Sequence, residues 1–511
     1  AIWSMSLVAH AQQSQAPQVK PVPRTEETSK SISPTPVRPV EEKLEPGVVI
    51  ARVVSTSDPT KSYALYLPTS YNSAAASSNA TDRDLTQATR DSNSEMKAAT
   101  GRRTPKFPII YCFDPGARGV VPVERFKDAA EKYGYIVVGS NNSRNGPQAL
   151  SEIVRDLWAD THGRFSIDDQ RIYVAGFSGG ARVAISVGFW LEGKIAGVIA
   201  SGAGFPADIP PDSPRSFSLF AVAGTDDFNN PEIQTLARKL NGSTPPVRLA
   251  IFDGGHGWLP AQAATDAVEW LEVQAMKSGI RERNPALINE IFQHAFSQAS
   301  AAESGGDKYG AYRRYAAMVQ DFSGLHDVAE VEKKAKELGA TKAVKDAIKQ
   351  EKRMEEDQVF RTQSIHKVIS AYEASDQSFE SLVALRGELK SYREAAKAPA
   401  TSAKRTLARR VLGSVFVGFF EQGNMAMFRK EYERAATYFS ICTEIQPDNA
   451  HAFFFLARAH ALSGSGNKAL DALKTAADKG FAGLQELMGK EFEELQAEKR
   501  FKEILEIVKK N

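Results

Sequence analysis

The sequence predicts an α/β domain with a mostly parallel sheet, followed by an all-α region. Between residues 47 and 280, short β-rich runs alternate with amphipathic helical stretches. This alternation is typical of a parallel sheet with helices on both faces. After Pro285 the strand pattern vanishes, and Ala, Glu, Lys, Leu and aromatic residues recur at helical spacing to the C-terminus. The 511 residues are too many for one hydrophobic core.

Composition argues against several classes of protein. The formal net charge is only +2, which gives no electrostatic case for binding nucleic acid. No apolar run reaches the ~20 residues that span a bilayer, so we expect no membrane span. Cys112 and Cys442 lie far apart and offer neither a disulfide framework nor the spacing of a zinc site.

Residues 1–46 predict a signal-peptide remnant and a disordered linker. Ile2 to Val8 is mildly apolar, and Ala9-His10-Ala11 fits the small-x-small pattern of a cleavage site. The residues that follow, to Pro46, are rich in Pro and Glu and predict a flexible tether. We therefore expect a periplasmic or secreted protein.

The α/β domain is expected to span residues 47–280. Two β-rich runs at its start, 47–54 and 62–68, can pair as an antiparallel hairpin at a sheet edge. Residues 73–104 are rich in small polar residues and charge, so they predict a disordered surface insertion. The other predicted strands are 107–113, 135–139, 171–175, 195–201, 217–223 and 247–252. The predicted helices are 123–133, 149–162, 181–191, 231–240 and 261–277.

The all-α region divides into residues 285–400, which show helices without a clean period, and residues 401–511, which show a repeat. Four positions recur after roughly 34 residues, the length of a tetratricopeptide unit: Ala435, Phe439, Cys442 and Pro447 are followed by Ala469, Leu473, Ala476 and Phe481. This end of the chain therefore resembles tetratricopeptide repeats, with an irregular helical bundle as the alternative. Such repeats would offer a surface for a protein partner or for self-association.

A predicted strand that ends in a glycine-rich turn places one serine in an unusual setting. The stretch RIYVAGFSGGARVA (171–184) runs from a buried strand through Gly176, Ser178 and Gly180, in G-x-S-x-G spacing, into a helix. Glycine allows backbone angles and close approaches that a Cβ forbids. We expect this turn to lift the Ser178 hydroxyl off the sheet edge at a helix N-terminus, the position of a nucleophile.

A serine nucleophile needs a base, and the base needs a carboxylate to orient it. His256 lies in the glycine-rich loop of LAIFDGGHGWLP, directly after a predicted core strand, and can take the Ser178 proton. Asp227 ends a G-T-x-D turn after the preceding strand and is the predicted acid. Asp226 is the runner-up and Asp253 a weaker third candidate. The chain order of serine, aspartate and histidine is that of α/β-hydrolases.

The oxyanion of a tetrahedral intermediate needs two preset donors. The backbone N–H of Gly179, directly after the serine, is the first predicted donor. The second is expected from the loop FDPGARG that follows the 107–113 strand. Pro115 has no N–H, so Gly116 is the predicted donor and Ala117 the fallback.

Two further side chains are candidates for substrate contact. Trp258 follows the histidine and can wall the acyl pocket, with packing in the core as the alternative. Asn142, like Asn141 beside it, follows a strand end and can bind substrate, with turn formation as the alternative.

Residues 48–279 resemble α/β-hydrolases of the feruloyl esterase and polyhydroxybutyrate depolymerase-like type, which are related to dienelactone hydrolases. The stretches that carry the resemblance are YALYLP (63–68), FDPGARG (113–119), RFSIDDQRIYVAGFSGGAR (164–182), GTDDFN (224–229) and GGHGW (254–258). The resemblance implies an α/β-hydrolase fold with Ser178 as nucleophile, Asp227 as acid and His256 as base. The sequence departs from the family at Asp114-Pro115, where His-Gly is usual, and has Ser178 where dienelactone hydrolases proper use Cys.

These observations predict a serine carboxylester hydrolase that works through an acyl-enzyme without metal or cofactor. Aryl, short acyl and hydroxyalkanoate esters all fit as substrates. Two alternatives remain at this point: a helical-repeat interaction protein with a non-catalytic hydrolase domain, and a peptidase of the same fold.

Overall fold

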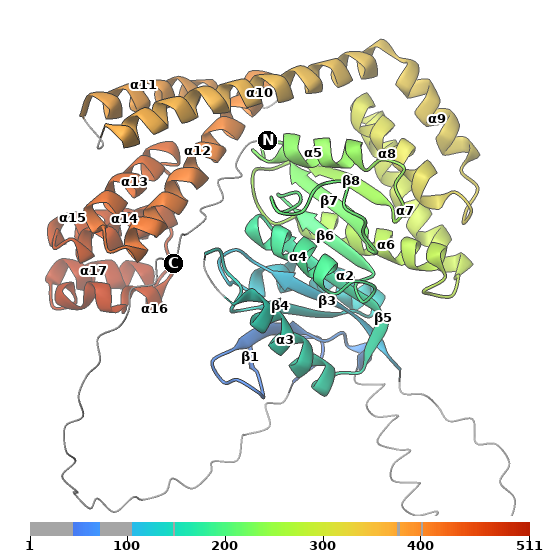
Figure 1. Cartoon of the computed structure of the whole chain (residues 1–511), viewed down its shortest axis with the longest axis horizontal. Helices are drawn as coiled ribbons and strands as arrows, with labels where there is room; N and C mark the ends of the chain where they lie inside the picture. Colours follow the sequence, from blue (N-terminus) through green and yellow to red (C-terminus); the bar gives the residue numbers. More distant parts are fainter. Residues whose placement is uncertain (1–43, 72–104, 147–148, 376–378, 400–401) are drawn as a thin grey trace, which may run out of the picture.

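The structure is a computed structural model that describes residues 44–71, 105–146, 149–375, 379–399 and 402–511. It contains an eight-stranded sheet with helices on both faces and a helical region that continues to the C-terminus (Figure 1). The predicted signal-peptide remnant, the linker up to residue 43 and the predicted insertion at 73–104 lie outside the described residues.

The sheet confirms the predicted α/β-hydrolase fold. Its strand order is β1-β2-β4-β3-β5-β6-β7-β8. Strands β1 (Val49–Val54) and β2 (Ser62–Tyr66) form the expected antiparallel hairpin at one edge, and β2 also pairs antiparallel with β4 (Ile136–Ser140). The remaining pairs are parallel. They join β3 (Phe107–Phe113), β5 (Ile167–Phe177), β6 (Gly197–Ser201), β7 (Ser218–Gly224) and β8 (Val247–Phe252).

Helices cover the sheet on both faces, as the alternating pattern predicts. One face packs against α2 (Val120–Tyr133) and α6 (Ala261–Ser278). The other packs against α3 (Leu150–Arg164), α4 (Gly179–Trp190) and α5 (Asn230–Lys239). With both faces buried, the central strands can be apolar throughout. The open C-terminal edge of the parallel strands is where a site can form.

The predicted elements occur with ends that differ by a few residues. The largest difference is in β5, which runs from Ile167 to Phe177, whereas the sequence pattern predicts a strand only over 171–175. Its first residue pairs with Phe107, and the register then shifts before Ile172 pairs with Ile109. The polar residues inside this irregular stretch hide the start of the strand from a hydrophobicity pattern.

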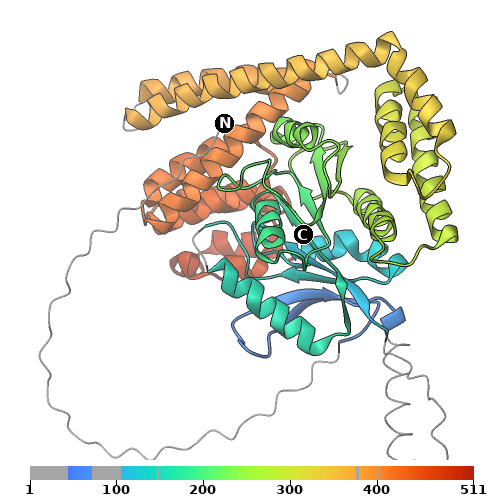
Figure 2. The same ribbon diagram turned by 45° about the vertical axis from the view of Figure 1, so that its right-hand side comes forward.

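The helical region begins against the α/β domain. Helices α7 (Pro285–Ser304), α8 (Lys308–Phe322) and α9 (Ala329–Ala340) share a core with the end of α6. The long helix α10 (Lys342–Ala374) then crosses from this group to a second group of helices (Figures 1 and 2).

The second helical group contains the predicted repeat. Two cores, one around α10–α14 and one around α14–α17, hold it together. Its elements are α11 (Phe379–Ala395), α12 (Ala403–Phe428), α13 (Tyr432–Ile445), α14 (Ala450–Leu462), α15 (Gly466–Asp478), α16 (Leu484–Leu487), η1 (Lys490–Leu495) and α17 (Lys499–Val508). The helical character is confirmed, and the tetratricopeptide assignment stays a prediction. Among the described residues, no helix combines the length and apolarity needed to cross a membrane.

Candidate active site

Ser178 sits in a strained turn between a strand and a helix. β5 ends at Phe177 and α4 begins at Gly179, while Ser178 itself has φ 53° and ψ −121°. A positive φ is unfavourable for a residue with a Cβ and persists only where the surroundings enforce it. Here the Ser178 N–H donates to the Ser201 carbonyl at 2.8 Å, which ties the turn to β6.

Glycine is required on both sides of this serine. A Cβ on Gly176 would collide with the backbone carbonyl of Gly180. A Cβ on Gly180 would collide with the carbonyl of Phe113 at the end of β3. The G-x-S-x-G spacing therefore reflects a backbone packed too closely for larger residues, and this packing aims the serine outwards.

The structure brings the three predicted catalytic side chains together in one hydrogen-bonded chain. His256 Nε2 lies 2.9 Å from Ser178 Oγ, and His256 Nδ1 lies 2.9 Å from Asp227 Oδ1. Asp227 follows β7 and His256 follows β8, so all three come from C-terminal ends of parallel strands. A proton on Nδ1, donated to the carboxylate, leaves Nε2 free to accept the serine proton.

The surroundings of the imidazole fix its plane. The rings of Phe177 and Phe228 lie 4.7 Å and 4.3 Å from the His256 ring, centroid to centroid. The His256 side chain is 14% exposed, whereas the Asp227 side chain is fully buried. A buried carboxylate facing a nearly enclosed imidazole has little water to compete with their hydrogen bond.

The two other candidate acids point elsewhere. Asp226 faces Arg409 and Arg405 of α12, with Oδ2 at 3.1 and 3.6 Å from their nearest nitrogens. Asp253 accepts a hydrogen bond from the Thr225 hydroxyl at 3.3 Å. Of the three aspartates, Asp227 alone bonds to His256 in the described part of the chain.

The structure does not support Gly116 as the second oxyanion donor. Its N–H donates to Asp114 Oδ1 at 2.8 Å, and the N–H of the fallback, Ala117, donates to the Asp114 carbonyl at 3.1 Å. Asp114 is fully buried and draws the loop around its own side chain. Gly179 remains a suitable first donor, because the first N–H groups of a helix have no intrahelical acceptor.

The two candidate substrate contacts belong to the scaffold. Trp258 is buried, and its indole N–H donates to Asp114 Oδ2 at 2.8 Å, so it packs in the core behind the site. Asn142 accepts a hydrogen bond from the Ser62 N–H at 2.8 Å and joins the end of β4 to the start of β2. In both cases the contacts fit the alternative, a structural role, and the role as substrate ligand stays a prediction.

A residue that the sequence patterns did not indicate also lies near the triad. Glu421 of α12 is exposed to solvent, but partial desolvation by the protein around it raises the pKa of its carboxyl. The charge that His256 carries when it is protonated, and the charge of Arg182, oppose this rise in pKa. Glu421 lies far beyond the triad along the chain, so no local motif could have connected them.

One group of potential metal ligands occurs in the described part of the chain, away from the triad. Asp266 and Glu269 of α6 and His294 of α7 present ligand atoms within 4.8 Å of one another. His294 Nδ1 is hydrogen-bonded to Glu269 at 2.6 Å, and the ammonium group of Lys132 lies 3.5 Å from the other oxygen of Glu269. The side chains of this group thus bond to one another and to Lys132, and they form a polar contact between helices α6 and α7.

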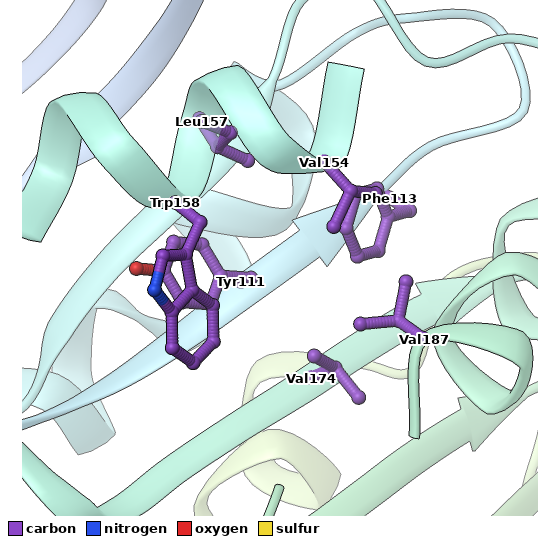
Figure 3. A pocket seen from close by; sticks show the side chains of 7 residues that line it. All are labelled: Tyr111, Phe113, Val154, Leu157, Trp158, Val174 and Val187. Atoms are coloured by element: carbon purple, nitrogen blue, oxygen red, sulfur yellow. The ribbon is translucent and has the colours of Figure 1, made fainter. Parts of the chain in front are cut away.

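A small apolar cavity lies inside the α/β domain, between the sheet and the helices α3 and α4, away from the reactive side chains (Figure 3). The residues that line it come from β3, β5, α3 and α4: Tyr111, Phe113, Val154, Leu157, Trp158, Val174 and Val187. Its volume of about 10 Å³ is far below the several hundred that hold a small-molecule ligand. We interpret this cavity as a packing gap in the core.

Comparisons with known proteins add fold-level likeness only. No model of a known family matches the sequence, and no curated protein matches it. The fluorophosphonate-binding serine hydrolase FphF of Staphylococcus aureus matches over 44% of this chain and 99% of its own, with 14% identity and a TM-score of 0.32. A ferulic acid esterase matches over 44% and 96%, with 17% identity and a TM-score of 0.33. Similarity this remote leaves the activity to be argued from the site itself.

Proposed function

We propose that this protein is a serine carboxylester hydrolase. The observation that carries the proposal is the hydrogen-bonded chain from Ser178 through His256 to Asp227, with both links at 2.9 Å. A hydroxyl, an imidazole and a buried carboxylate in this order are the parts that nucleophilic acyl transfer needs.

The geometry supports a two-step reaction. Ser178 Oγ attacks the ester carbonyl while His256 Nε2 takes its proton, and Asp227 stabilises the resulting imidazolium. The Gly179 N–H can donate to the oxyanion of the tetrahedral intermediate. His256 then gives its proton to the departing alcohol, which leaves an acyl-enzyme. Water then attacks the acyl carbonyl while the same imidazole takes its proton. The bond to Ser178 Oγ breaks, the imidazolium returns the proton to that oxygen, and the acid is released.

Replacement of the nucleophile tests this proposal. We expect Ser178→Ala to lower kcat for p-nitrophenyl acetate by about 10⁴- to 10⁶-fold, because no other group can form the acyl-enzyme. A fluorophosphonate probe should label the tryptic peptide that contains Ser178. Ser278→Ala is the matched control, because the Ser278 hydroxyl donates to the carbonyls of Gln274 and Ala275 in its own helix. Full activity in Ser178→Ala, or labelling of another residue, would contradict the proposal.

The substrate class is the finer part of the proposal. Aryl, short acyl and hydroxyalkanoate esters are all compatible with the triad. A panel of p-nitrophenyl esters with graded acyl length, run beside a hydroxycinnamoyl ester and a hydroxybutyrate oligomer, separates them by kcat/KM. We also infer export from Ala9-His10-Ala11, which cell fractionation can test.

A further inference from the structure

The loop that carries Asp227 is in contact with the C-terminal helical region. Helices α10 and α12 lie on the side of the α/β domain that carries α5, the helix that follows this loop (Figures 1 and 2). The contacts cross a large distance in sequence: Arg410 is 185 residues away from Thr225, to which it bonds. We define residues 225–229 as the acid loop.

Two buried side chains of the helical region hold the backbone of the acid loop. Arg410 of α12 is 3% exposed and donates from Nε to the Thr225 carbonyl at 2.8 Å. Gln358 of α10 is 6% exposed and donates from Nε2 to the Phe228 carbonyl at 2.7 Å. The two held carbonyls flank Asp227, so the helical region fixes the loop on both sides of the carboxylate.

Further contacts join the acid loop to α12. The Asp226 carboxylate pairs with Arg409 at 3.1 Å. Gly413, almost one turn after Arg410, lies so near the acid loop that a Cβ there would come within 3.3 Å of the Phe228 ring. That ring in turn packs on His256 at 4.3 Å. The helix therefore touches both neighbours of the catalytic carboxylate in sequence.

The position of the Asp227 carboxylate depends on this loop. Oδ1 accepts from His256 and from the Asn229 N–H at 2.8 Å. Oδ2 is buried and accepts no hydrogen bond from the residues that the structure describes. With one oxygen unheld, the carboxylate is oriented mainly by its backbone, and a shift of about 1 Å can cost 10²-fold in rate.

Burying a guanidinium group costs free energy unless hydrogen bonds and nearby opposite charges compensate for the lost water. Burial lowers the pKa of Arg410, and the nearby carboxylates, Glu351, Asp226, Asp227 and Glu355, oppose that effect. Hydrogen bonds from a charged donor are about twice as strong as neutral ones. A buried cation bonded to a backbone carbonyl is therefore a firm anchor for the loop.

We propose that Arg410 and Gln358 are positioning residues for Asp227, and that the helical region is a working part of the active site. This inference rests on the proposed esterase function. It predicts that the triad is fully ordered only when α10 and α12 hold the acid loop, so that changes far from the nucleophile in sequence slow the chemical step.

The test compares variants of the whole chain. Arg410→Met and Gln358→Leu keep a side chain of similar size and remove its hydrogen bond to the acid loop, so we call them the anchor variants. Arg410→Lys keeps the positive charge but lacks the planar guanidinium group. Arg238→Ala is the matched control. It breaks the Arg238–Glu355 ion pair at 2.8 Å, which joins α5 to α10 without touching the acid loop.

We expect both anchor variants to lower kcat for p-nitrophenyl acetate by about 10- to 100-fold with KM changed less than about twofold. Arg410→Lys should recover part of this loss, and Arg238→Ala should behave as wild type. Proton NMR should show the far-downfield Nδ1–H resonance of His256, assigned by its loss in Asp227→Asn, weakened in the anchor variants only. A role confined to folding would change thermal stability and leave this resonance in place.

Each outcome decides the inference. Wild-type kcat and an unchanged resonance in the anchor variants would overturn it. If Arg410→Met does not fold, Gln358→Leu decides alone, because it removes a neutral bond to the same loop. If the wild-type chain hydrolyses no ester and reacts with no fluorophosphonate, the proposed function fails, while the NMR comparison still tests the positioning of Asp227.

Discussion

Two adjacent carboxylates in the acid loop face opposite directions. Asp227 is fully buried and bonds to the imidazole of His256, while Asp226 turns to the arginines of α12. Neighbouring residues in a tight turn point their side chains to different sides. One aspartate can therefore serve the triad while the other joins the two regions of the molecule.

This division predicts different effects for two conservative substitutions. Asp227→Asn should lower kcat by about 10⁴-fold, because an amide favours the wrong imidazole tautomer while it keeps the shape of the side chain. Asp226→Asn should cost less than about fivefold, because its side chain faces the arginines of α12 and not the imidazole of His256. Steady-state kinetics on p-nitrophenyl acetate measure both. Equal losses in the two variants would mean that the acid has been misassigned.

For single residues, the sequence predicted those that follow the ends of strands. It missed those whose role depends on contacts with residues far away along the chain. Ser178, His256 and the candidate aspartates follow predicted strands, so topology alone brings them to one edge of the sheet. The prediction of Gly116 as a donor does not fit the contacts, because the buried Asp114 side chain accepts hydrogen bonds from the N–H groups of Gly116 and Arg118. No pattern along the chain shows where a single carboxylate will point.

Among the elements, the junction of β5 and α4 depends on small residues. Gly176 and Gly180 let β5, α4 and the end of β3 approach at backbone distance. The strained backbone of Ser178 is held between them. The local rigidity needed by the nucleophile thus comes from close packing of main chain against main chain.

Alanine substitutions at glycines measure this demand. Gly176→Ala should destabilise the fold by about 3 kcal/mol or more and abolish activity, since its Cβ would overlap the Gly180 carbonyl. Gly163→Ala is the control. Gly163 is exposed in α3, and an added methyl group would meet no atom there, so this substitution should stabilise the fold by about 0.5–1 kcal/mol. Thermal unfolding midpoints test both, and a stable, active Gly176→Ala would show that the junction is not closely packed.

The order of strands and helices was predictable, because apolar residues recur at helical spacing in the helices and form short continuous runs in the buried strands. The ends were less so: β5 starts earlier than the pattern predicts, at Ile167, because polar residues interrupt its apolar pattern. The recurrence of small and large residues predicts helices at α13 and α15, and both helices bury the three recurring positions that they contain. The fourth position of the first unit, Pro447, lies after α13 and is exposed.

Over the whole molecule, the helical region returns to the α/β domain and covers the side that carries the acid loop. Sequence patterns predict helices in this region but not which distant surface α12 will meet. Arg410 and Glu421 look like ordinary helix charges in the sequence, and the fold alone brings them to the active site. The two regions are therefore coupled through buried polar contacts, which a division at residue 280 does not reveal.

Glu421 is expected to make the stability of the fold depend on pH. Burial raises the pKa of its carboxyl above the ordinary value of 4.5, against the opposing effect of His256 and Arg182. A group with a raised pKa in the folded state binds more protons there than in the unfolded state. Its contribution to stability is thus fully present below the unfolded pKa and is lost as the pH rises through the folded pKa.

Glu421→Gln, which stays neutral at every pH, should remove this dependence. We expect thermal unfolding midpoints of variant and wild type to coincide near about pH 4 and to separate above it, with the variant the more stable at about pH 8. Because solvent reaches the carboxylate, the difference should not exceed about 1 kcal/mol. A variant less stable than wild type in the alkaline range would show that attraction to His256 and Arg182 outweighs burial. In that case α12 would be held against the active site by the charge of Glu421, and its neutral form would loosen the contact.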